Sequence, residues 1–176
     1  MYNLSLHSPK IGKNELKYVK DCLKTGWITN GKYTTKFSSK IKKITNSNYV
    51  IPCVNGTSAL HIALKVLGVN KNHEVIVPTT TFIASVNAIL YNLASPIFVD
   101  IDQSLTINVK KIFNFFETQT YFKNGYTYNK KTKKIIKAII VVHTFGNAVN
   151  LEKLNTFCKS QNIKVIEDAA ESLGTK

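Results

Sequence analysis

The chain has 176 residues, of which 44% are hydrophobic, and this is enough for a globular domain with a sizeable buried core. Its formal net charge is +14, but all of its basic residues are Lys and they are scattered over many segments, whereas Arg is the usual side chain for reading bases and phosphates. This composition favours a solvated, compositionally biased surface over a nucleic-acid-binding protein.

The first 48 residues predict a helical segment interrupted by a loop. Apolar residues recur at helical spacing on both sides of Gly26-Trp-Ile-Thr-Asn-Gly31, whose bounding glycines indicate a turn-rich loop. The apolar residues of the two helical faces are Leu16, Val19 and Leu23 before the loop, and Phe37, Ile41 and Ile44 after it. We therefore expect two short amphipathic helices in this part of the chain.

From residue 49 the chain alternates between short apolar runs and helical patterns. Strands are predicted at Tyr49–Val54, Glu74–Val77, Pro96–Asp100, Lys137–Val142 and Lys164–Ile166. Helices are predicted at Thr57–Leu67, Thr81–Leu93, Val109–Glu117 and Leu151–Ser160. Short, apolar strands that alternate with helices are typical of a parallel sheet covered on both faces. The predicted fold class is α/β, with a parallel-rich sheet and flanking helices.

One stretch departs from this alternation. Aromatic residues beside a polar turn in Thr120–Lys134 predict a β-hairpin inserted in a β-α connection, at about residues 120–135. The interleaved Tyr and Lys residues are also compatible with a surface that stacks nucleic-acid bases. A hairpin with a solvated tip is the favoured interpretation, because such compositional signals are weak.

The cysteines Cys22, Cys53 and Cys158 are far apart and show no CxxC or Cys/His spacing, so reduced thiols and no metal site are predicted. No apolar run reaches the length of a membrane span, and the first residues lack the apolar core of a signal peptide. We expect a cytoplasmic protein that has neither a membrane nor nucleic acid as its partner.

A phosphate site is predicted where Asn55-Gly-Thr-Ser-Ala-Leu60 follows a strand and opens a helix. Gly56 allows close approach to the backbone, and Thr57 and Ser58 add hydroxyl groups to the free N–H groups of a first helical turn. Asn, Thr and Ser are also ordinary helix caps, so a purely structural role remains an equal alternative for this motif taken alone.

Other strand ends bring further candidates to the same edge of the sheet. Phe82 follows one strand and could stack on a planar ligand, although a lone aromatic is more often a core residue. His143 follows the Ile139–Val142 run, and a lone His is more often satisfied structurally than functional. Glu167 and Asp168 end the last strand, where a carboxylate can pair with a ring nitrogen, a sugar hydroxyl or a metal, or can cap a helix.

Together these features fit one cofactor, pyridoxal 5'-phosphate (PLP). The phosphate would lie on Gly56–Ser58, and the pyridine ring would stack on Phe82. Asp168 would pair with the pyridinium nitrogen and keep it protonated, so that the ring acts as an electron sink. Dinucleotide binding fits less well, because no GxGxxG motif is present.

With these motifs, the chain resembles the DegT/DnrJ/StrS-type sugar aminotransferases over essentially its whole length. The motifs that carry the resemblance are Asn55-Gly-Thr-Ser-Ala-Leu60, Pro78-Thr-Thr-Thr-Phe82, Phe98-Val-Asp-Ile-Asp102, Val142-His-Thr-Phe-Gly146, Glu167-Asp-Ala-Ala-Glu-Ser-Leu-Gly174 and, at the family's substrate loop, Gly26-Trp-Ile-Thr-Asn-Gly31. The hairpin insertion and Glu171 look most like the LegC branch, which aminates a nucleotide-linked 4-keto-6-deoxy-N-acetylhexosamine on the route to legionaminic-acid-type sugars.

The resemblance implies a fold-type-I, aspartate-aminotransferase-like large domain, a homodimer, glutamate as amino donor and a UDP- or GDP-linked sugar of surface-polysaccharide biosynthesis as substrate. The cofactor residues that it implies are Gly56, Thr57, Ser58, Phe82, Asp168 and Glu171, with Glu171 near the ring hydroxyl. The substrate residues expected in such a protein are Trp27, Thr29, Asn30 and His143.

The chain departs from the family in its catalytic Lys. The family's Schiff-base Lys follows the Glu-Asp-Ala-Ala segment in a Ser-Phe-x-x-x-Lys context, which does not occur here, and Lys176 does not fit it. We therefore expect residues 1–48 to form a helical segment with the substrate loop, residues 49–176 to form an incomplete PLP-binding domain, and the C-terminal domain to be absent. Such a chain would be inactive alone; a non-catalytic binding module is the alternative, and a basic nucleic-acid binder ranks third.

Overall fold

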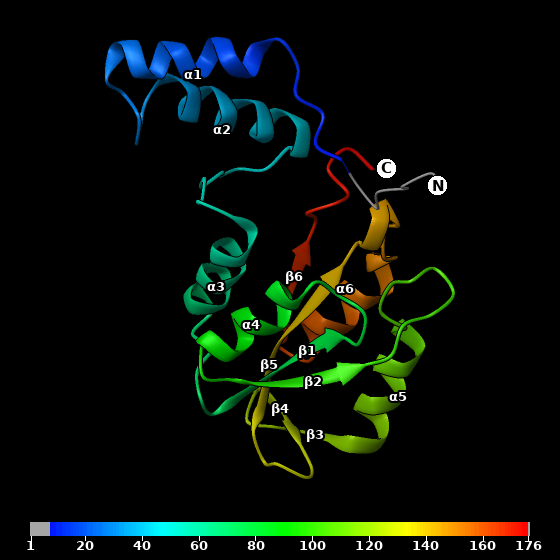
Figure 1. The fold of residues 1–176 in the computed structure, drawn as a ribbon. Coiled ribbons are helices and arrows are strands. Elements are labelled where there is room, and N and C mark those ends of the chain that lie inside the picture. The colour runs from blue at the N-terminus through cyan, green and yellow to red at the C-terminus, as the bar shows by residue number, and fades with distance from the viewer. Residues whose placement is uncertain (1–7, 176) are drawn as a thin grey trace, which may run out of the picture. The chain divides into compact units, whose positions relative to one another are not determined.

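The computed structural model describes residues 8–175, which form two compact units with their boundary between Pro52 and Cys53. In the first unit, α1 (Asn14–Thr25) and α2 (Lys32–Thr45) pack side by side, as the helical spacing predicted (Figure 1). Gly26 ends α1 with a φ of 74°, a left-handed conformation that favours glycine. No side chain of α1 or α2 is buried, so this unit has no core of its own.

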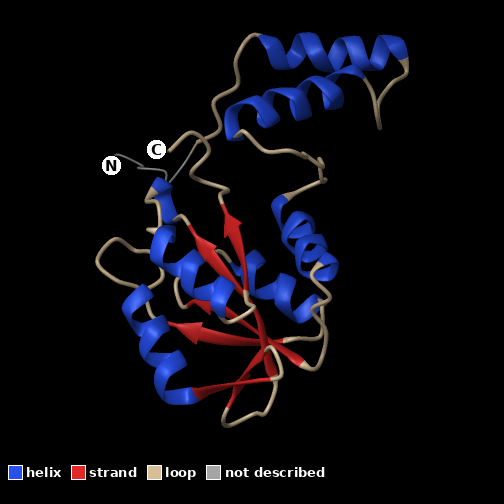
Figure 2. Ribbon diagram, turned by 180° about the vertical axis from the view of Figure 1, so that it is seen from behind, coloured by secondary structure: helices blue, strands red, loops and turns tan. Residues whose placement is uncertain are grey.

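The second unit is an α/β structure, with strands and helices in alternation (Figure 2). Its elements are α3 (Gly56–Val66), β1 (His73–Pro78), α4 (Ile83–Tyr91), β2 (Ser95–Val99), α5 (Val109–Gln119), β3 (Thr120–Lys123), β4 (Tyr126–Asn129), β5 (Ile135–Val142), the 3-10 turn η1 (Thr144–Gly146), α6 (Leu151–Ser160) and β6 (Lys164–Asp168). Strands β2, β1, β5 and β6 are parallel neighbours in that order, and β3 and β4 form an antiparallel hairpin on the amino end of β5.

The core lies on both faces of the parallel strands. Val75 and Val77 of β1 pack with Leu64 of α3 and Ile89 of α4, while Ile76 packs on the opposite face with residues of α5 and α6. This alternation follows from the two-residue repeat of a strand. The register between β1 and β5 shifts between Glu74 and Val75, a bulge that resets which side chains of β5 face each core.

The α/β prediction is confirmed, and the predicted helices, the hairpin and four of the five predicted strands are present within a few residues. The predicted strand Tyr49–Val54 is wrong, because no strand forms there. The segment crosses the boundary between the two units, and Pro52 has no N–H to donate to a sheet. Tyr49 and Val54 are largely exposed, so the apolar run is not buried as a sheet strand would be. None of the helices in residues 8–175 is long and apolar enough to cross a membrane.

Candidate active site

The carboxyl ends of the parallel strands place Phe82 and Asp168, two of the predicted cofactor residues, at one edge of the sheet. Asp168 is the last residue of β6 and pairs in register with Val142, the last residue of β5 (Figure 1). Pro78, at the end of β1, leads directly into the Thr79–Phe82 turn before α4. Ligand sites of open α/β sheets lie at this edge, so the fold brings these strand-end residues to a suitable place.

The Asp168 carboxylate is held from two sides. Its Oδ2 accepts a 2.8 Å hydrogen bond from the Ser85 hydroxyl, and its Oδ1 accepts one of 3.3 Å from the Ala170 amide. Ser85 is fully buried in the first turn of α4, and its hydroxyl lies 2.9 Å from that of Thr81. The Asp168 side chain therefore has a fixed orientation, set by a helix 83 residues away in the sequence.

Phe82 lies immediately before α4 with its ring in solvent. Its side chain is 77% exposed, so it is not the core residue that a lone aromatic most often is. The backbone there is extended, with φ −63° and ψ 141°, which places Phe82 just outside α4, whose first residue is Ile83. The exposed ring thus lies three residues before Ser85, the residue that donates to Asp168.

The first turn of α3 has donors that the protein does not use. The Asn55 side chain accepts a 2.8 Å hydrogen bond from the Ser58 amide and caps the helix. Within residues 8–175, no acceptor contacts the amides of Gly56 and Thr57 or the hydroxyls of Thr57 and Ser58. A side chain at Gly56 would meet nothing within 4 Å, so space is open above this turn. Free amides at a helix N-terminus are a suitable site for an anion.

His143 has both ring nitrogens occupied. Nδ1 accepts a 3.1 Å hydrogen bond from the Val149 amide, so the proton of the neutral ring is on Nε2, which donates to Glu167 Oε2 at 3.0 Å. The residue is 5% exposed. The hydrogen bonds show a structural role that orients Glu167, and a role of His143 in substrate binding stays a prediction.

Glu171 holds the turn that follows β5. Its Oε2 accepts a 2.7 Å hydrogen bond from the Phe145 amide. Phe145 has a φ of 53° and Gly146 one of 84°, so the left-handed turn between β5 and α6 is fixed by this carboxylate. Its expected position near a ring hydroxyl stays a prediction.

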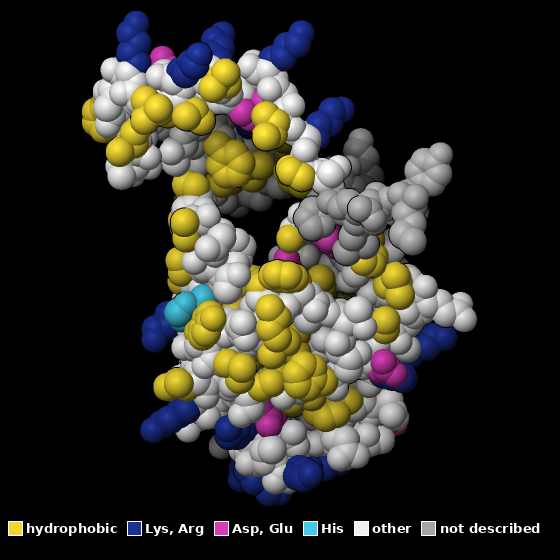
Figure 3. Space-filling model, in the orientation of Figure 1, with side chains coloured by type: hydrophobic (Ala, Val, Ile, Leu, Met, Phe, Trp, Pro, Cys, Tyr) yellow, Lys and Arg dark blue, Asp and Glu magenta, His cyan; other side chains and the backbone are white. Residues whose placement is uncertain are grey.

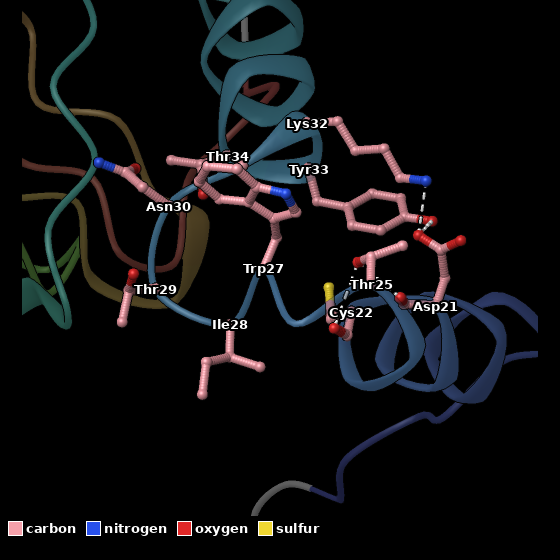
Figure 4. A pocket seen from close by; sticks show the side chains of 11 residues that line it. Asp21, Cys22, Thr25, Trp27, Ile28, Thr29, Asn30, Lys32, Tyr33 and Thr34 are labelled. Carbon is pink, nitrogen blue, oxygen red and sulfur yellow. Dashed lines mark hydrogen bonds and ion pairs between the residues drawn. The ribbon is translucent and has the colours of Figure 1, made fainter.

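The other three predicted substrate residues lie in the first unit. Trp27, Thr29 and Asn30 line a pocket of about 390 Å³ between the loop after α1 and the start of α2 (Figure 4). One wall of the pocket is the Asp21 carboxylate, which accepts hydrogen bonds from the Lys32 ammonium at 2.6 Å and from the Tyr33 hydroxyl at 3.1 Å. Polar and aromatic groups are thus gathered around one hollow.

These contacts shift the ionisation of the pocket wall. The hydrogen bond from Lys32 lowers the pKa of Asp21, and the same contact raises the pKa of Lys32. Desolvation, together with the hydrogen bond to Asp21, raises the pKa of Tyr33. The wall therefore keeps an ionised carboxylate, an ammonium group and a neutral phenol over a wide range of pH.

Some residues of these sites were missed by sequence reasoning. Ser85 follows Phe82 by three positions in a predicted helix, so its place in the first turn could have been inferred, but its pairing with Asp168 could not. Asp21 and Lys32 meet only because α1 and α2 pack together, and no local signal marks them. Among residues 8–175, no group of three His, Cys, Asp or Glu residues is placed to hold a metal ion.

Comparison with known proteins gives concordant results. The profile of the DegT/DnrJ/EryC1/StrS aminotransferase family matches residues 9–176. The GDP-perosamine synthase of Escherichia coli is 38% identical over 177 aligned positions, covering 100% of this chain and 44% of that protein. A DegT DnrJ EryC1 StrS aminotransferase from Brucella abortus aligns with a TM-score of 0.80 and 28% identity, covering 89% of this chain and 40% of that one.

A further solved structure carries a cofactor. NtdA from Bacillus subtilis, with bound cofactor PMP, aligns with a TM-score of 0.76 and 31% identity, covering 90% of this chain and 33% of that one. The chain thus spans less than half the length of the curated relatives it matches, 44% of the Escherichia coli protein and 43% of the GDP-perosamine synthase of Vibrio cholerae.

Proposed function

Since the chain belongs to the DegT/DnrJ/EryC1/StrS aminotransferase family, we propose that it supplies the cofactor cradle of an enzyme that transfers an amino group from glutamate to a nucleotide-linked 4-keto-6-deoxy sugar. The cofactor is PLP, on which the family depends and whose amine form, PMP, is bound in NtdA. The observation that carries the proposal is the hydrogen bond between Ser85 and Asp168, made three residues after the exposed Phe82.

The residues present fit PLP. The amides of Gly56 and Thr57 and the hydroxyls of Thr57 and Ser58, which contact no acceptor within residues 8–175, suit its phosphate, because they open a helix whose dipole favours an anion. The exposed ring of Phe82 suits a planar heterocycle. The Asp168 carboxylate, already oriented by Ser85, suits a protonated ring nitrogen.

Each residue then has a defined task. When bound, PLP supplies an electron sink that allows an amino group to pass between carbon skeletons. Asp168 would hold the proton on the ring nitrogen by accepting its hydrogen bond, while Ser85 keeps the carboxylate in one orientation. Glu171 fixes the Phe145 turn, and its carboxylate is the group proposed to lie near the ring hydroxyl.

For the substrate, we favour a GDP-linked sugar of surface-polysaccharide biosynthesis. This choice is supported by two relatives that are GDP-perosamine synthases and are 38% and 33% identical to this chain. A UDP-linked substrate of the LegC-like, legionaminic-acid type is the alternative, and it rests on the hairpin insertion and on Glu171. In either case the pocket of Trp27, Thr29 and Asn30 is proposed to contact the sugar nucleotide in a homodimeric enzyme.

Turnover requires a Lys that these 176 residues do not supply in the family's sequence context. Without such an amine there is no base for the proton shift between donor and acceptor carbons. We propose that the 176-residue chain by itself binds cofactor or sugar nucleotide without transamination.

The test uses the protein expressed from its whole natural gene, with PLP, glutamate and either a GDP-linked or a UDP-linked 4-keto-6-deoxy sugar. With the GDP-linked substrate, the protein from the whole gene is expected to form the 4-amino sugar, measured by mass spectrometry. The 176-residue chain alone is expected to form none. Amination of the UDP-linked sugar alone would support the LegC-like alternative. Amination of neither sugar would refute the proposed activity.

A second readout does not depend on turnover. Ser85→Ala should weaken PLP binding in an absorbance titration and change the pH dependence of the cofactor spectrum, because Asp168 loses the hydroxyl that orients it. Glu117→Gln, on the exposed surface of α5, is the matched control and should leave both unchanged.

A further inference from the structure

The register of the inserted hairpin sorts its side chains onto two faces. Tyr121 pairs with Tyr128 and Lys123 with Tyr126, so these four side chains share one face of the β3–β4 ribbon. The other face carries Thr120, Thr127 and Asn129, which are buried, and Phe122, which is exposed near the hairpin tip. The hairpin therefore has an inner face against the protein and an outer face toward solvent.

Two more Lys residues join the outer face. The Lys133 ammonium lies 5.8 Å from the centre of the Tyr121 ring, and that of Lys137 lies 5.6 Å from the centre of the Tyr126 ring. Tyr121 and Tyr128 stack on each other, with ring centres 5.3 Å apart. The tyrosine–lysine face of the hairpin consists of Tyr121, Lys123, Tyr126, Tyr128, Lys133 and Lys137.

This face carries charge of one sign. Between Glu117 and Glu152 the sequence has six Lys residues and no Asp or Glu. Dark-blue Lys side chains gather at the hairpin end of the sheet unit in Figure 3, where β3 and β4 lie in Figure 1. The surface is therefore a local cation cluster, in contrast to the scattered Lys residues elsewhere in the chain.

The face is also held rigidly. The Asn129 amide donates a 2.9 Å hydrogen bond to Glu74 Oε2, and both residues are buried. The Asn162 amide donates to the Gly125 carbonyl at 2.9 Å, and the Thr127 hydroxyl to the Gln161 carbonyl at 3.1 Å. The hairpin is thus fastened along its length, and little ordering remains to oppose binding.

We propose that the tyrosine–lysine face docks on the anionic phospholipid headgroups of a membrane surface. Lys ammonium groups and Tyr hydroxyls can donate to lipid phosphates, and Tyr rings are suited to the depth of the headgroups. Tyr128 stacks on Tyr121, and the ammonium groups of Lys133 and Lys137 lie over the rings of Tyr121 and Tyr126, so each ring already has a partner within the protein, which disfavours the base stacking used by single-stranded nucleic acid.

This proposal departs from the expectation that no membrane is a partner. That expectation rested on the lack of a spanning segment and of a signal peptide, and a peripheral surface needs neither. Only the strand register shows that the Tyr and Lys residues share a face. The proposal is independent of the transaminase activity and places the protein beside the membrane.

The test is sedimentation of the purified protein with phospholipid vesicles. Binding is expected to vesicles of phosphatidylglycerol and phosphatidylcholine in equal parts, but not to phosphatidylcholine alone, and it should disappear between about 50 mM and about 500 mM NaCl. No binding to the anionic vesicles at low salt would overturn the proposal. So would tighter binding to single-stranded oligonucleotides than to the vesicles, which would assign the face to nucleic acid.

A charge-matched pair of variants locates the contact. Lys133→Gln with Lys137→Gln should weaken partitioning onto anionic vesicles roughly 25-fold, about fivefold for each Lys removed. Lys17→Gln with Lys20→Gln removes the same charge from the exposed surface of α1 and should change partitioning less than about threefold. Equal losses in the two pairs would show a diffuse charge effect and refute a specific face.

Discussion

Apolar sequence patterns predicted both the sheet unit (residues 53–175) and the helical pair α1–α2, but only the sheet unit has a buried core. In the sheet unit, Val75, Ile76 and Val77 are fully buried between helices on both faces. In the helical pair, Leu23 is 69% exposed although it lies on a regular amphipathic face. An amphipathic repeat therefore predicts where a helix lies, whereas a buried unit also needs apolar neighbours that cover the helix face.

This difference separates the two kinds of predicted site residue. Asp168 and Ser85 stand on a strand and a helix anchored in the core, which suits a cofactor that must be held in one orientation. Trp27 and Asn30 stand on a loop between poorly buried helices, which suits contact with a substrate that enters and leaves. Four substitutions test whether the sheet unit and the helical pair differ in this way in solution.

The largest effect is expected at the centre of the sheet. Ile139→Ala should lower the free energy of unfolding by about 3–4 kcal/mol, because Ile139 is fully buried and its loss leaves a cavity. Ile139→Val should cost about 1 kcal/mol in the same urea unfolding experiment. If Ile139→Ala lowers the free energy of unfolding by less than Ile139→Val does, the core side chains must rearrange to fill the cavity.

A smaller effect is expected where the hairpin joins the sheet. Asn129→Leu should cost about 2 kcal/mol, because the buried Glu74 carboxylate loses the amide that donates to it. Replacing both residues by Leu should recover part of the loss. Additive costs in this double-mutant cycle would show that the pair contributes nothing as a unit.

The sequence was informative wherever the structure is local. The strand alternation around Val75–Val77, the hairpin after Thr120 and the strand-end position of Asp168 all follow from patterns a few residues long. The contact of Ser85 with Asp168 spans 83 residues, and that of Asn129 with Glu74 spans 55. Such contacts depend on strand order and register, which no local pattern encodes.

The same physics explains the wrong strand and the exposed helices. Tyr49–Val54 has strand-like composition but no neighbour in the sheet formed by the described residues. The helical spacing of Leu16, Val19 and Leu23 predicted α1 correctly, yet it says nothing about what covers the apolar face. Composition and periodicity report the conformation that a segment favours, and pairing decides whether that segment is buried.

The contrast is tested directly by a matched truncation in the helical pair. Leu23→Ala should change the free energy of unfolding by less than about 0.5 kcal/mol, because the side chain is mostly exposed and Ala favours the helix. Urea unfolding followed by circular dichroism measures the free energy of unfolding of Leu23→Ala and of Ile139→Ala under the same conditions. A cost approaching that of Ile139→Ala would show that the face of α1 is covered in solution.

The smallest effect should come from His73 at the start of β1. Burial, with a contribution from Lys137, lowers the pKa of His73 below 6.5, and its Nδ1 accepts a 3.1 Å hydrogen bond from the Asn70 amide. The unfolded chain therefore binds the proton more readily, so stability is complete above pH 6.5 and is lost as the pH falls toward the folded-state pKa. Unfolding midpoints at about pH 7.5 and about pH 5.5 should differ less in His73→Gln than in the parent protein, since other titrating groups are common to both. An unchanged difference would mean that His73 ionises alike in the folded and unfolded chain, and that the amino end of β1 is as open to water as the helical pair.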